Sequence, residues 1–377
     1  MKPLTVLLTA SLLISTAAFA ATPAETAIQK AQAQIAKNPN HAPYYNALAM
    51  AYARRARETS DVQYYAKAEQ TLQRSFALEP DNYEALKTQA WLELGRHEFA
   101  KALETATRLN KKTPDDVMVY GYLVDANVEL GNYKAAVDAA QWMLDLRTGN
   151  VPGLTRAGYL RELHGNLPGA LELMQMAYDA TPTTETEDRA WMLTQMAHLD
   201  FVAGDLPKAE RYASGALGLF PDYHYALGTL AQVRIAQKRY DEAVELLRKR
   251  YAAAPHAENL YALADALELA GQTEDAQKDF AEFERESLAE TNLPDTSHPE
   301  LIAYYTDHAH APGKALEVAK REVARRKDVF TLDCYAWALA ANGDYASANE
   351  QIQMALQVGV KDPKILAHAE SIAEHLN

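Results

Sequence analysis

Three kinds of residue are scarce in this chain of 377 residues, and each scarcity excludes something. The single cysteine, Cys334, excludes an intramolecular disulfide, and its position excludes a lipid attached to a cysteine at the mature N-terminus. Sixteen glycines and sixteen prolines are few, and a low content of these two helix breakers favours a helical protein. Lysine and arginine (37) are outnumbered by aspartate and glutamate (51). The resulting formal net charge of −14 disfavours nucleic acid as a partner.

Long apolar runs are also missing after the first twenty residues. Lys2 gives a basic start, residues 4–14 form a short apolar stretch, and Ala18 to Ala20 supply the small residues that a signal peptidase requires. A membrane anchor is the alternative, but the stretch has only about half of the roughly twenty apolar residues that span a bilayer. We therefore expect residues 1–20 to be a secretory signal peptide cleaved near Ala20. The mature protein is then periplasmic or secreted and is not an integral membrane protein.

Strong catalytic signatures are absent as well. The chain has no HExxH, no glycine-rich phosphate loop, no GxSxG and no CxxC. The best metal candidate is the cluster His298, Asp307, His308 and His310, because imidazole and carboxylate groups together bind zinc or copper. His308 and His310 project to opposite sides of a helix, however, and could chelate together only if the segment before Pro312 unwinds. We expect that the protein is not an enzyme and that it uses no metal and no cofactor. A hydrolase or metal-dependent enzyme is the alternative.

What the chain has in abundance is a repeat with a period of 34 residues. Each interval contains two apolar patterns of helical spacing, separated by a turn that often contains glycine, such as Gly131 or Gly204. The second pattern ends near a proline, which stops a helix. The residues that mark the period are Pro80, Pro114, Thr148 and Pro182, and then Pro221 and Pro255.

A small residue in each pattern lies where two helices must approach closely, because a bulkier side chain would push them apart. Examples are Ala90, Gly158, Ala197 and Ala231 in the first helix, and Ala102, Ala136, Ala170 and Ala209 in the second. These residues resemble the tetratricopeptide repeat family, in the form of an exported bacterial member, over nearly the whole mature chain. The resemblance implies an all-α fold, namely a right-handed superhelical solenoid of helix pairs with terminal capping helices. It also implies a binding scaffold rather than an enzyme.

The repeat predicts the organisation of the chain. We expect a tetratricopeptide array with an N-terminal capping helix over 21–283, an irregular linker or hinge over 284–299, and C-terminal units with a capping helix over 300–377. Eight or nine units fit this length. Two departures interrupt the period: about two extra helical turns at residues 54–62, and an acidic insertion at 183–188 that lengthens one interval from 34 to 39 residues.

Charged runs allow two interpretations. The basic runs 54–57, 248–250 and 325–327 either dock an acidic partner or form solvated helix faces, and solvation is the simpler interpretation. Glu185, Glu187 and Asp188 similarly form either a docking loop or a soluble insertion.

The first helices of such an array line a concave groove, and its residues can be assigned by phase. Aromatic side chains there would bind an extended peptide, a helix or a sugar, or would simply fill space between repeats. We predict a protein-interaction scaffold in the cell envelope that binds a protein or peptide segment in this groove. A receptor for a small ligand or glycan is the alternative. Equivalent positions of successive first helices form a column along the groove. The column of positions directly after the small residue contains Met50, Trp91, Asp125, Tyr159, His198, Gln232, Asp265, Tyr304 and Trp337, and neighbouring columns add Asn46, Lys87, Trp191, Phe201, Tyr225 and Tyr261.

Overall fold

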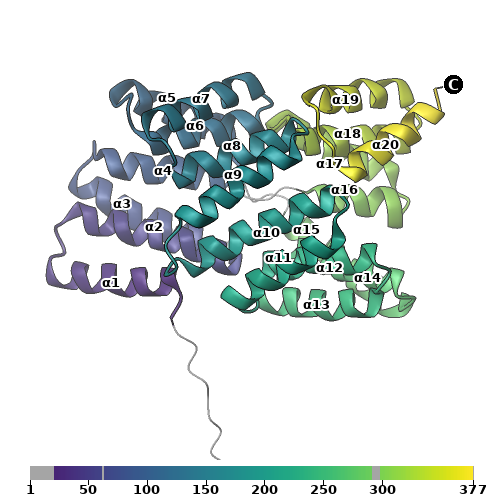
Figure 1. Ribbon diagram of the computed structural model, residues 1–377, viewed down its shortest axis with the longest axis horizontal. Helices are drawn as coiled ribbons and strands as arrows, with labels where there is room; N and C mark the ends of the chain where they lie inside the picture. Colours follow the sequence, from purple (N-terminus) through teal and green to yellow (C-terminus); the bar gives the residue numbers. More distant parts are fainter. Residues whose placement is uncertain (1–20, 62, 291–297, 377) are drawn as a thin grey trace, which may run out of the picture.

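The protein is all-helical over the residues that the structure describes. The computed structural model describes residues 21–61, 63–290 and 298–376, which contain twenty α-helices, one π-helix and no strand (Figure 1). The predicted signal peptide, residues 1–20, lies outside these ranges. None of the described helices has both the length and the apolar character that crossing a bilayer requires.

The helices follow one another with short connections. In chain order they are α1 (Pro23–Lys37), α2 (Ala42–Thr59), α3 (Gln63–Leu78), α4 (Tyr83–Gly95), α5 (Phe99–Lys112), α6 (Val117–Glu129), α7 (Tyr133–Leu146), α8 (Val151–Leu163), α9 (Leu167–Ala180), α10 (Thr186–Val202), α11 (Leu206–Leu219), α12 (His224–Ala236), α13 (Tyr240–Ala253), α14 (Ala257–Leu269), α15 (Thr273–Glu290), α16 (Pro299–Ala303), the π-helix η1 (Tyr304–His308), α17 (Pro312–Arg325), α18 (Val329–Ala341), α19 (Tyr345–Val358) and α20 (Pro363–Glu374).

Adjacent helices pack as pairs, from α2–α3 to α18–α19. The described residues contain nine such pairs, in which α16 and η1 together act as the first helix of the eighth. This arrangement confirms the predicted all-α solenoid of helix pairs. Helices α1 and α20 lie at its two ends. α1 packs on α2 and α20 packs on α18 and α19, so each covers a terminal pair.

Small residues set the distance between paired helices, as the sequence predicts. Gly158 of α8 and Ala170 of α9 are both buried, and a Cβ atom on Gly158 would lie 3.4 Å from the Ala170 backbone oxygen. The helices therefore pack almost backbone to backbone at this point. The equivalent alanines of other pairs are fully buried, namely Ala90, Ala102, Ala136, Ala197, Ala209 and Ala231.

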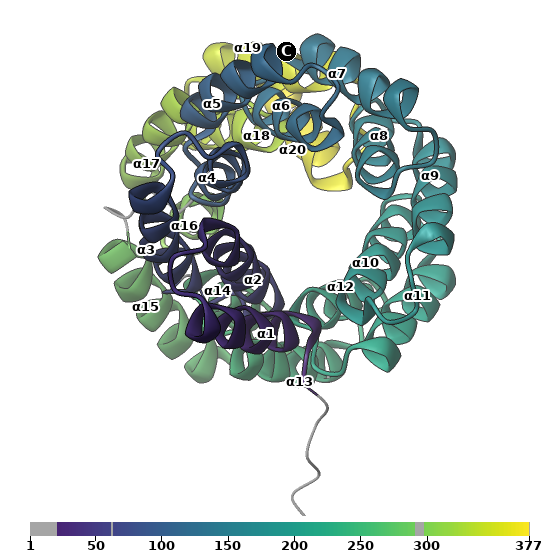
Figure 2. The same ribbon diagram turned by 90° about the vertical axis from the view of Figure 1, so that its left-hand side faces the viewer.

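The pairs wind into a right-handed superhelix. In Figure 2 the chain runs clockwise from α1 through α4, α8 and α12 while it recedes from the viewer, because the N-terminal helices occupy the near end of the axis. The path exceeds one full turn. Helices α14 to α19 therefore lie behind the N-terminal helices along the axis, and the second turn packs on the first.

Contacts between the two turns combine polar and apolar groups. The Lys327 backbone N–H donates to the Glu129 carbonyl oxygen at 2.8 Å, and the Val329 N–H donates to the Tyr133 hydroxyl at 2.9 Å. A hydrophobic cluster spans the same junction, because Leu160 of α8 belongs to the cluster that contains Leu332 and Leu339 of α18. The second turn is thus held to the first by a continuous core.

The predicted linker is shorter than expected. Helix α15 continues to Glu290, so residues 284–290 are helical instead of irregular, and α16 begins at Pro299. The period breaks in the sequence because α15, at 18 residues, extends beyond the 14 residues of other second helices such as α13. Residues 291–297 of the linker lie outside the described ranges.

Two glycines allow the contact between turns to be tested separately from backbone strain. Gly165 and Gly204 both have positive φ (75° and 81°), so alanine at either position costs about 1 kcal/mol in backbone strain. A Cβ on Gly165 would lie 2.4 Å from the Gly359 carbonyl oxygen of the second turn, whereas a Cβ on Gly204 meets no atom within 4 Å. We expect Gly165→Ala to lower the melting temperature clearly more than the matched Gly204→Ala. Equal losses in thermal denaturation would show that the turns do not meet at Gly165.

Candidate functional site

The first helices of five consecutive pairs surround a cavity near the centre of the first superhelical turn. Its volume is about 720 Å³, and α2, α4, α6, α8 and α10 each contribute lining residues. This volume falls within the range of about 300–1,000 Å³ that is typical of ligand pockets. The cavity is therefore the best candidate for a binding site on the inner surface.

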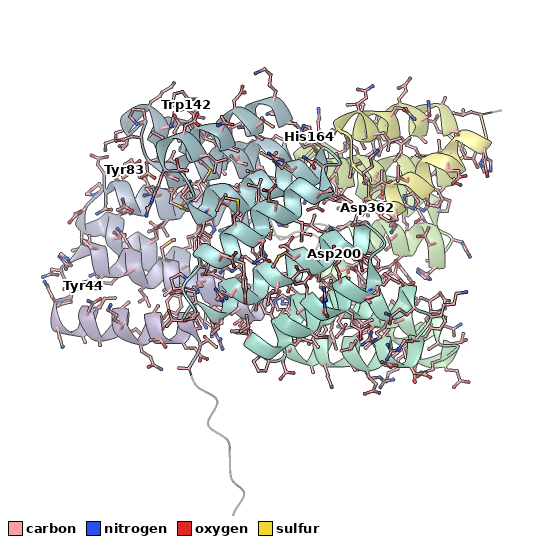
Figure 3. The ribbon with its side chains drawn as sticks, in the orientation of Figure 1. Tyr44, Tyr83, Trp142, His164, Asp200 and Asp362 are labelled. Atoms are coloured by element: carbon pink, nitrogen blue, oxygen red, sulfur yellow. The ribbon has the colours of Figure 1, made fainter. Side chains whose placement is uncertain are left out.

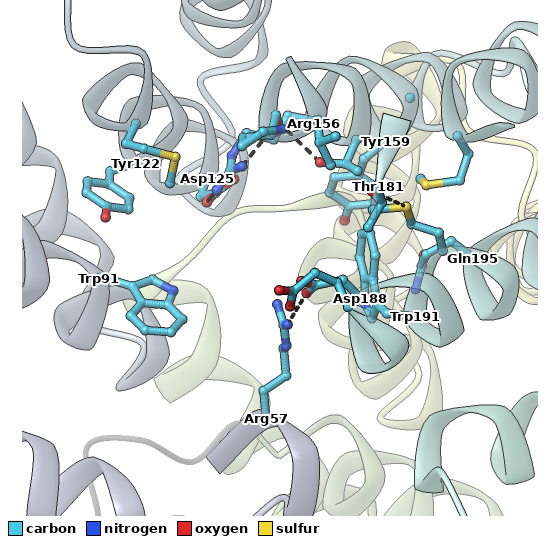
Figure 4. Close-up of a pocket in the computed structure, with 18 of the residues that line it drawn as sticks. Arg57, Trp91, Tyr122, Asp125, Arg156, Tyr159, Thr181, Asp188, Trp191 and Gln195 are labelled. Atoms are coloured by element: carbon cyan, nitrogen blue, oxygen red, sulfur yellow. Dashed lines mark hydrogen bonds and ion pairs between the residues drawn. The ribbon is translucent and has the colours of Figure 1, made fainter. Parts of the chain in front are cut away.

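Four aromatic side chains form facing walls of the cavity. Trp91 and Tyr122 lie on one side, and Tyr159 and Trp191 lie on the other (Figure 4). Within the part of the chain that the structure describes, no group bonds to their indole N–H or hydroxyl groups. These polar tips are therefore available to a ligand, while the rings supply apolar contact area.

Methionines supply much of the remaining apolar lining. Met50, Met118, Met174 and Met192 come from α2, α6, α9 and α10. The unbranched thioether side chain adapts to irregular shapes, and surfaces rich in methionine accept varied apolar groups. The cavity is therefore suited to apolar side chains of more than one shape.

An ion pair lies between the aromatic walls on one side of the cavity. Arg156 of α8 binds Asp125 of α6 through both Nε and Nη2, at 2.8 and 2.6 Å, and its Nε also donates to the Gly121 carbonyl oxygen at 3.1 Å. A Cβ on Gly121 would lie 3.0 Å from the guanidinium carbon, so glycine makes room for the arginine. The two-point contact fixes the arginine in one orientation.

A second group of ion pairs lies on the opposite side, and we call its five residues the clasp: Arg54 and Arg57 of α2, Glu185, and Glu187 and Asp188 of α10. Arg54 contacts Glu185 at 2.7 Å and Asp188 at 3.1 Å, and Arg57 contacts both Glu187 and Asp188. Burial alone would lower the pKa of Arg57, but the carboxylates of Glu187 and Asp188 outweigh it and hold the pKa above its ordinary value. Arg57 therefore stays charged.

The clasp arises from the two departures from the 34-residue period. Helices α2 and α10 have 18 and 17 residues, whereas first helices such as α6 and α12 have 13. The added turns of α2 carry the basic run 54–57, and the insertion 183–188 carries the acidic residues. For the residues of the clasp, the simpler interpretations of the charged runs are wrong. The basic run is not a solvated helix face and the acidic insertion is not a free loop, because the two bind each other.

Tyr223 and His224, at the start of α12, surround the buried part of the clasp. The Tyr223 hydroxyl donates to Glu187 at 2.7 Å, and the His224 Nε2 lies 3.3 Å from the Arg57 carbonyl oxygen and 3.5 Å from the Ser60 hydroxyl. Burial lowers the pKa of His224 to about 4, and the nearby charge of Arg250 adds to this effect. His224 is therefore neutral at physiological pH.

Five of the fifteen predicted groove residues line the cavity, namely Met50, Trp91, Asp125, Tyr159 and Trp191. Three others bind residues of neighbouring helices or of the short segments that precede them. These contacts are Asn46 with Asn82 (2.9 Å), Lys87 with Asp116 (2.8 Å) and His198 with Glu162 (2.9 Å).

The remaining predicted residues lie elsewhere. Tyr225 packs beside the clasp, with its ring centroid 3.9 Å from that of His224. Gln232 is exposed and Phe201 is half-buried. The others belong to the second turn: Tyr261, Asp265 and Tyr304 surround His308, and Trp337 donates to Asp307 at 2.7 Å beside a separate cavity of about 420 Å³. The structure therefore divides the predicted column instead of gathering it in one groove.

The candidate metal cluster does not assemble. Among the described residues, no three histidine, cysteine, aspartate or glutamate side chains are placed to hold a metal ion. The segment before Pro312 does leave the α-helical path, as the π-helix η1, but His308 bonds to Glu268 at 2.9 Å and His298 is buried at the start of α16. Burial also raises the pKa of Cys334 well above its ordinary value, which disfavours the thiolate form that a reactive cysteine requires.

Several cavity residues were not identified from the sequence, although their spacing could have revealed them. Tyr122 and Arg156 each lie three residues before a predicted position, Asp125 and Tyr159 respectively, and residues three apart share a helix face. The contacts of the clasp had no such signal. Opposite charge alone could not show that residues about 130 positions apart would meet.

Two segments of the chain match family models described as tetratricopeptide repeat, at residues 87–151 and 201–258. No curated protein matches the chain significantly in sequence. Among solved structures, it is similar to a human IFIT1 dimer with m7Gppp-AAAA, at 13% identity and a TM-score of 0.55, covering 88% of this chain and 85% of that one. It also resembles the Cut9-Hcn1 hetero-tetramer of APC/C, at 10% identity and a TM-score of 0.50. That match covers 92% of this chain but spans only 59% of the length of its relative. Likeness at these identities shows the fold alone.

His224 predicts a specific pH dependence of stability. Its pKa is about 4 in the folded protein and about 6.5 in an unfolded chain, so between these values the unfolded chain binds a proton that the folded protein does not. Its contribution to stability is therefore complete above about pH 6.5 and is lost as the pH falls toward 4. We expect His224→Gln to show a smaller fall in melting temperature from pH 7 to pH 4.5 than the wild type does. Parallel falls in the two proteins would contradict this assignment.

Proposed function

Because this chain is a tetratricopeptide repeat protein, we propose that it is a non-catalytic scaffold that binds an extended segment of a partner protein in the central cavity. The observation that carries the proposal is the facing pair of aromatic walls, whose indole and hydroxyl groups have no bonded partner among the described residues. Tryptophan and tyrosine are the side chains most often found as energetic anchors of protein interfaces.

The proposed binding mode follows from the lining. Apolar side chains of the segment would pack between Trp91 and Trp191 and against the methionines, while its backbone carbonyl oxygens would accept hydrogen bonds from the free indole and hydroxyl groups. Arg156 is already bound by Asp125, so the cavity does not offer a free cation to an acidic ligand. The net charge of −14 supports a protein partner rather than nucleic acid.

The proposed place of action is the cell envelope. It rests on the basic start, the short apolar stretch and the small residues of segment 1–20, which together have the pattern of a cleaved secretory signal. The protein would then bind its partner in the periplasm or outside the cell. A receptor for a glycan or small ligand would use the same aromatic walls, and the experiment below separates the two.

Photo-crosslinking at the cavity in the native host tests the function. We expect a photoreactive amino acid at Met118, on the cavity wall, to yield a protein adduct that maps to one segment of the partner. The same photoreactive amino acid in place of Trp142, which is 54% exposed on the outer helix α7, serves as the control and should not yield this adduct (Figure 3). Adducts formed with glycans alone, or equally at both positions, would overturn the proposal.

Tryptophan replacements then measure the contribution of the walls. We expect Trp91→Ala and Trp191→Ala each to weaken binding of the identified segment about 30-fold, the effect of losing an interface anchor. Trp142→Ala is the matched control and should leave binding unchanged. Isothermal titration calorimetry with the purified segment provides the measurement. Equal affinities for all three variants would place the binding site outside the cavity.

A further inference from the structure

The clasp closes the first superhelical turn into a ring. It joins α2 of the first pair to α10 of the fifth, and these two helices belong to opposite ends of the five pairs that surround the cavity. Figure 2 shows α2 and α10 facing each other across the lower part of the ring, with α12 beside them. Without this junction, the five pairs would form an open, curved groove.

This junction differs in kind from the junction between α8 and α18. The α8–α18 junction is spanned by a hydrophobic cluster, whereas the cluster on α2 and the cluster on α10 are separate. The clasp therefore joins two surfaces mainly through charge. Such a polar junction separates more readily than an apolar one, because water solvates the released charges.

The clasp has an inner and an outer part. Glu187 is fully buried and binds Arg57 and the Tyr223 hydroxyl, whereas Arg54 and Glu185 retain 24% and 37% of their side-chain exposure. Arg57, Glu185 and Asp188 also line the cavity. The same side chains therefore hold the ring closed and form one wall of the candidate binding site.

We propose that the clasp is a gate, which opens between α2 and α10 to admit the partner segment sideways and then closes around it. This inference rests on the proposed function. In the closed ring, an extended segment within a longer chain can pass through the cavity only after one end of that chain has threaded through the ring. Opening of the clasp removes that requirement, so that extended internal segments can bind. Competition by salt ions for the exposed charges favours the open state.

The gate can be tested without a partner, through the reactivity of a cysteine on the cavity wall. Met118→Cys supplies the reactive thiol, and Cys334→Ala removes the native one. The double replacement Glu185→Gln with Asp188→Asn weakens the clasp but keeps the buried contact between Arg57 and Glu187. Neutralising Glu69 and Arg96, an exposed pair at 2.6 Å that joins α3 to the end of α4, is the matched control.

We expect the weakened clasp to raise the rate of labelling by a bulky polyethylene glycol maleimide about fivefold or more. N-ethylmaleimide, which is small enough to enter the closed ring, should react at a similar rate in both proteins. Added salt should accelerate bulky labelling when the clasp is intact and have less effect when it is weakened. A bulky-reagent rate that is unchanged by the clasp replacements, or raised equally by the Glu69 and Arg96 control, would overturn the gate.

A locked variant connects the gate to partner binding. Arg54 reaches Glu185 through two long side chains, so cysteines on the two sides of the clasp are too far apart for a disulfide. The lock is therefore the pair Arg54→Cys with Thr184→Cys, bridged by a bis-maleimide, because the exposed Thr184 precedes Glu185 and neither replaced residue lines the cavity. We expect the bridged protein to lose the photo-adduct with an internal partner segment, and the unbridged protein to keep it. If the adduct persists in the bridged protein, the gate is wrong while the proposed function stands. If neither protein forms it, the proposed function fails, and the labelling rates still decide the gate.

Discussion

The close approach of paired helices at small residues is the constraint on which the rest of the structure depends. Where Gly158 meets Ala170, the two helices of a pair come almost to backbone contact, and the equivalent alanines of other pairs are fully buried. Because small residues recur at these positions, successive pairs stack with similar small rotations, and the rotations sum to a superhelix. The curvature places five first helices around one centre. The cavity is therefore a consequence of the small side chains at the contacts between paired helices.

Regular repeats produce the curvature, but irregular ones produce the closure. The extended α2 and the insertion at the start of α10 each disturb the period, and their charged residues meet at the clasp. Glu187 is removed from water completely, which is unfavourable unless its charge is balanced. Arg57 and the Tyr223 hydroxyl provide that balance. The match between two separate irregularities indicates that they form a single structural feature.

The sequence predicts those aspects of the fold that depend on local spacing. The period of 34 residues identifies the helix pairs, and the buried Ala90 and Ala197 show that phase alone places residues on a packed face. The same phase identified Trp91 and Tyr159 as inner residues. The phase of the repeat could not show which predicted groove residues lie in the first superhelical turn and which in the second. This assignment depends on the summed curvature of many pairs. For the same reason, the partners of Arg57 and the contact of Gly165 with Gly359 could not be predicted.

The stacking of the second turn on the first changes how such an array folds. In an open solenoid each repeat touches only its neighbours, so folding can start anywhere and spread along the chain. Here the Lys327 and Val329 amides bond to α6 and to Tyr133, nearly 200 residues away in sequence. Contacts of such separation slow folding, because chain entropy is lost before the contact forms. The C-terminal pairs therefore support the first turn, and unfolding of the array becomes more cooperative than a series of repeats would allow.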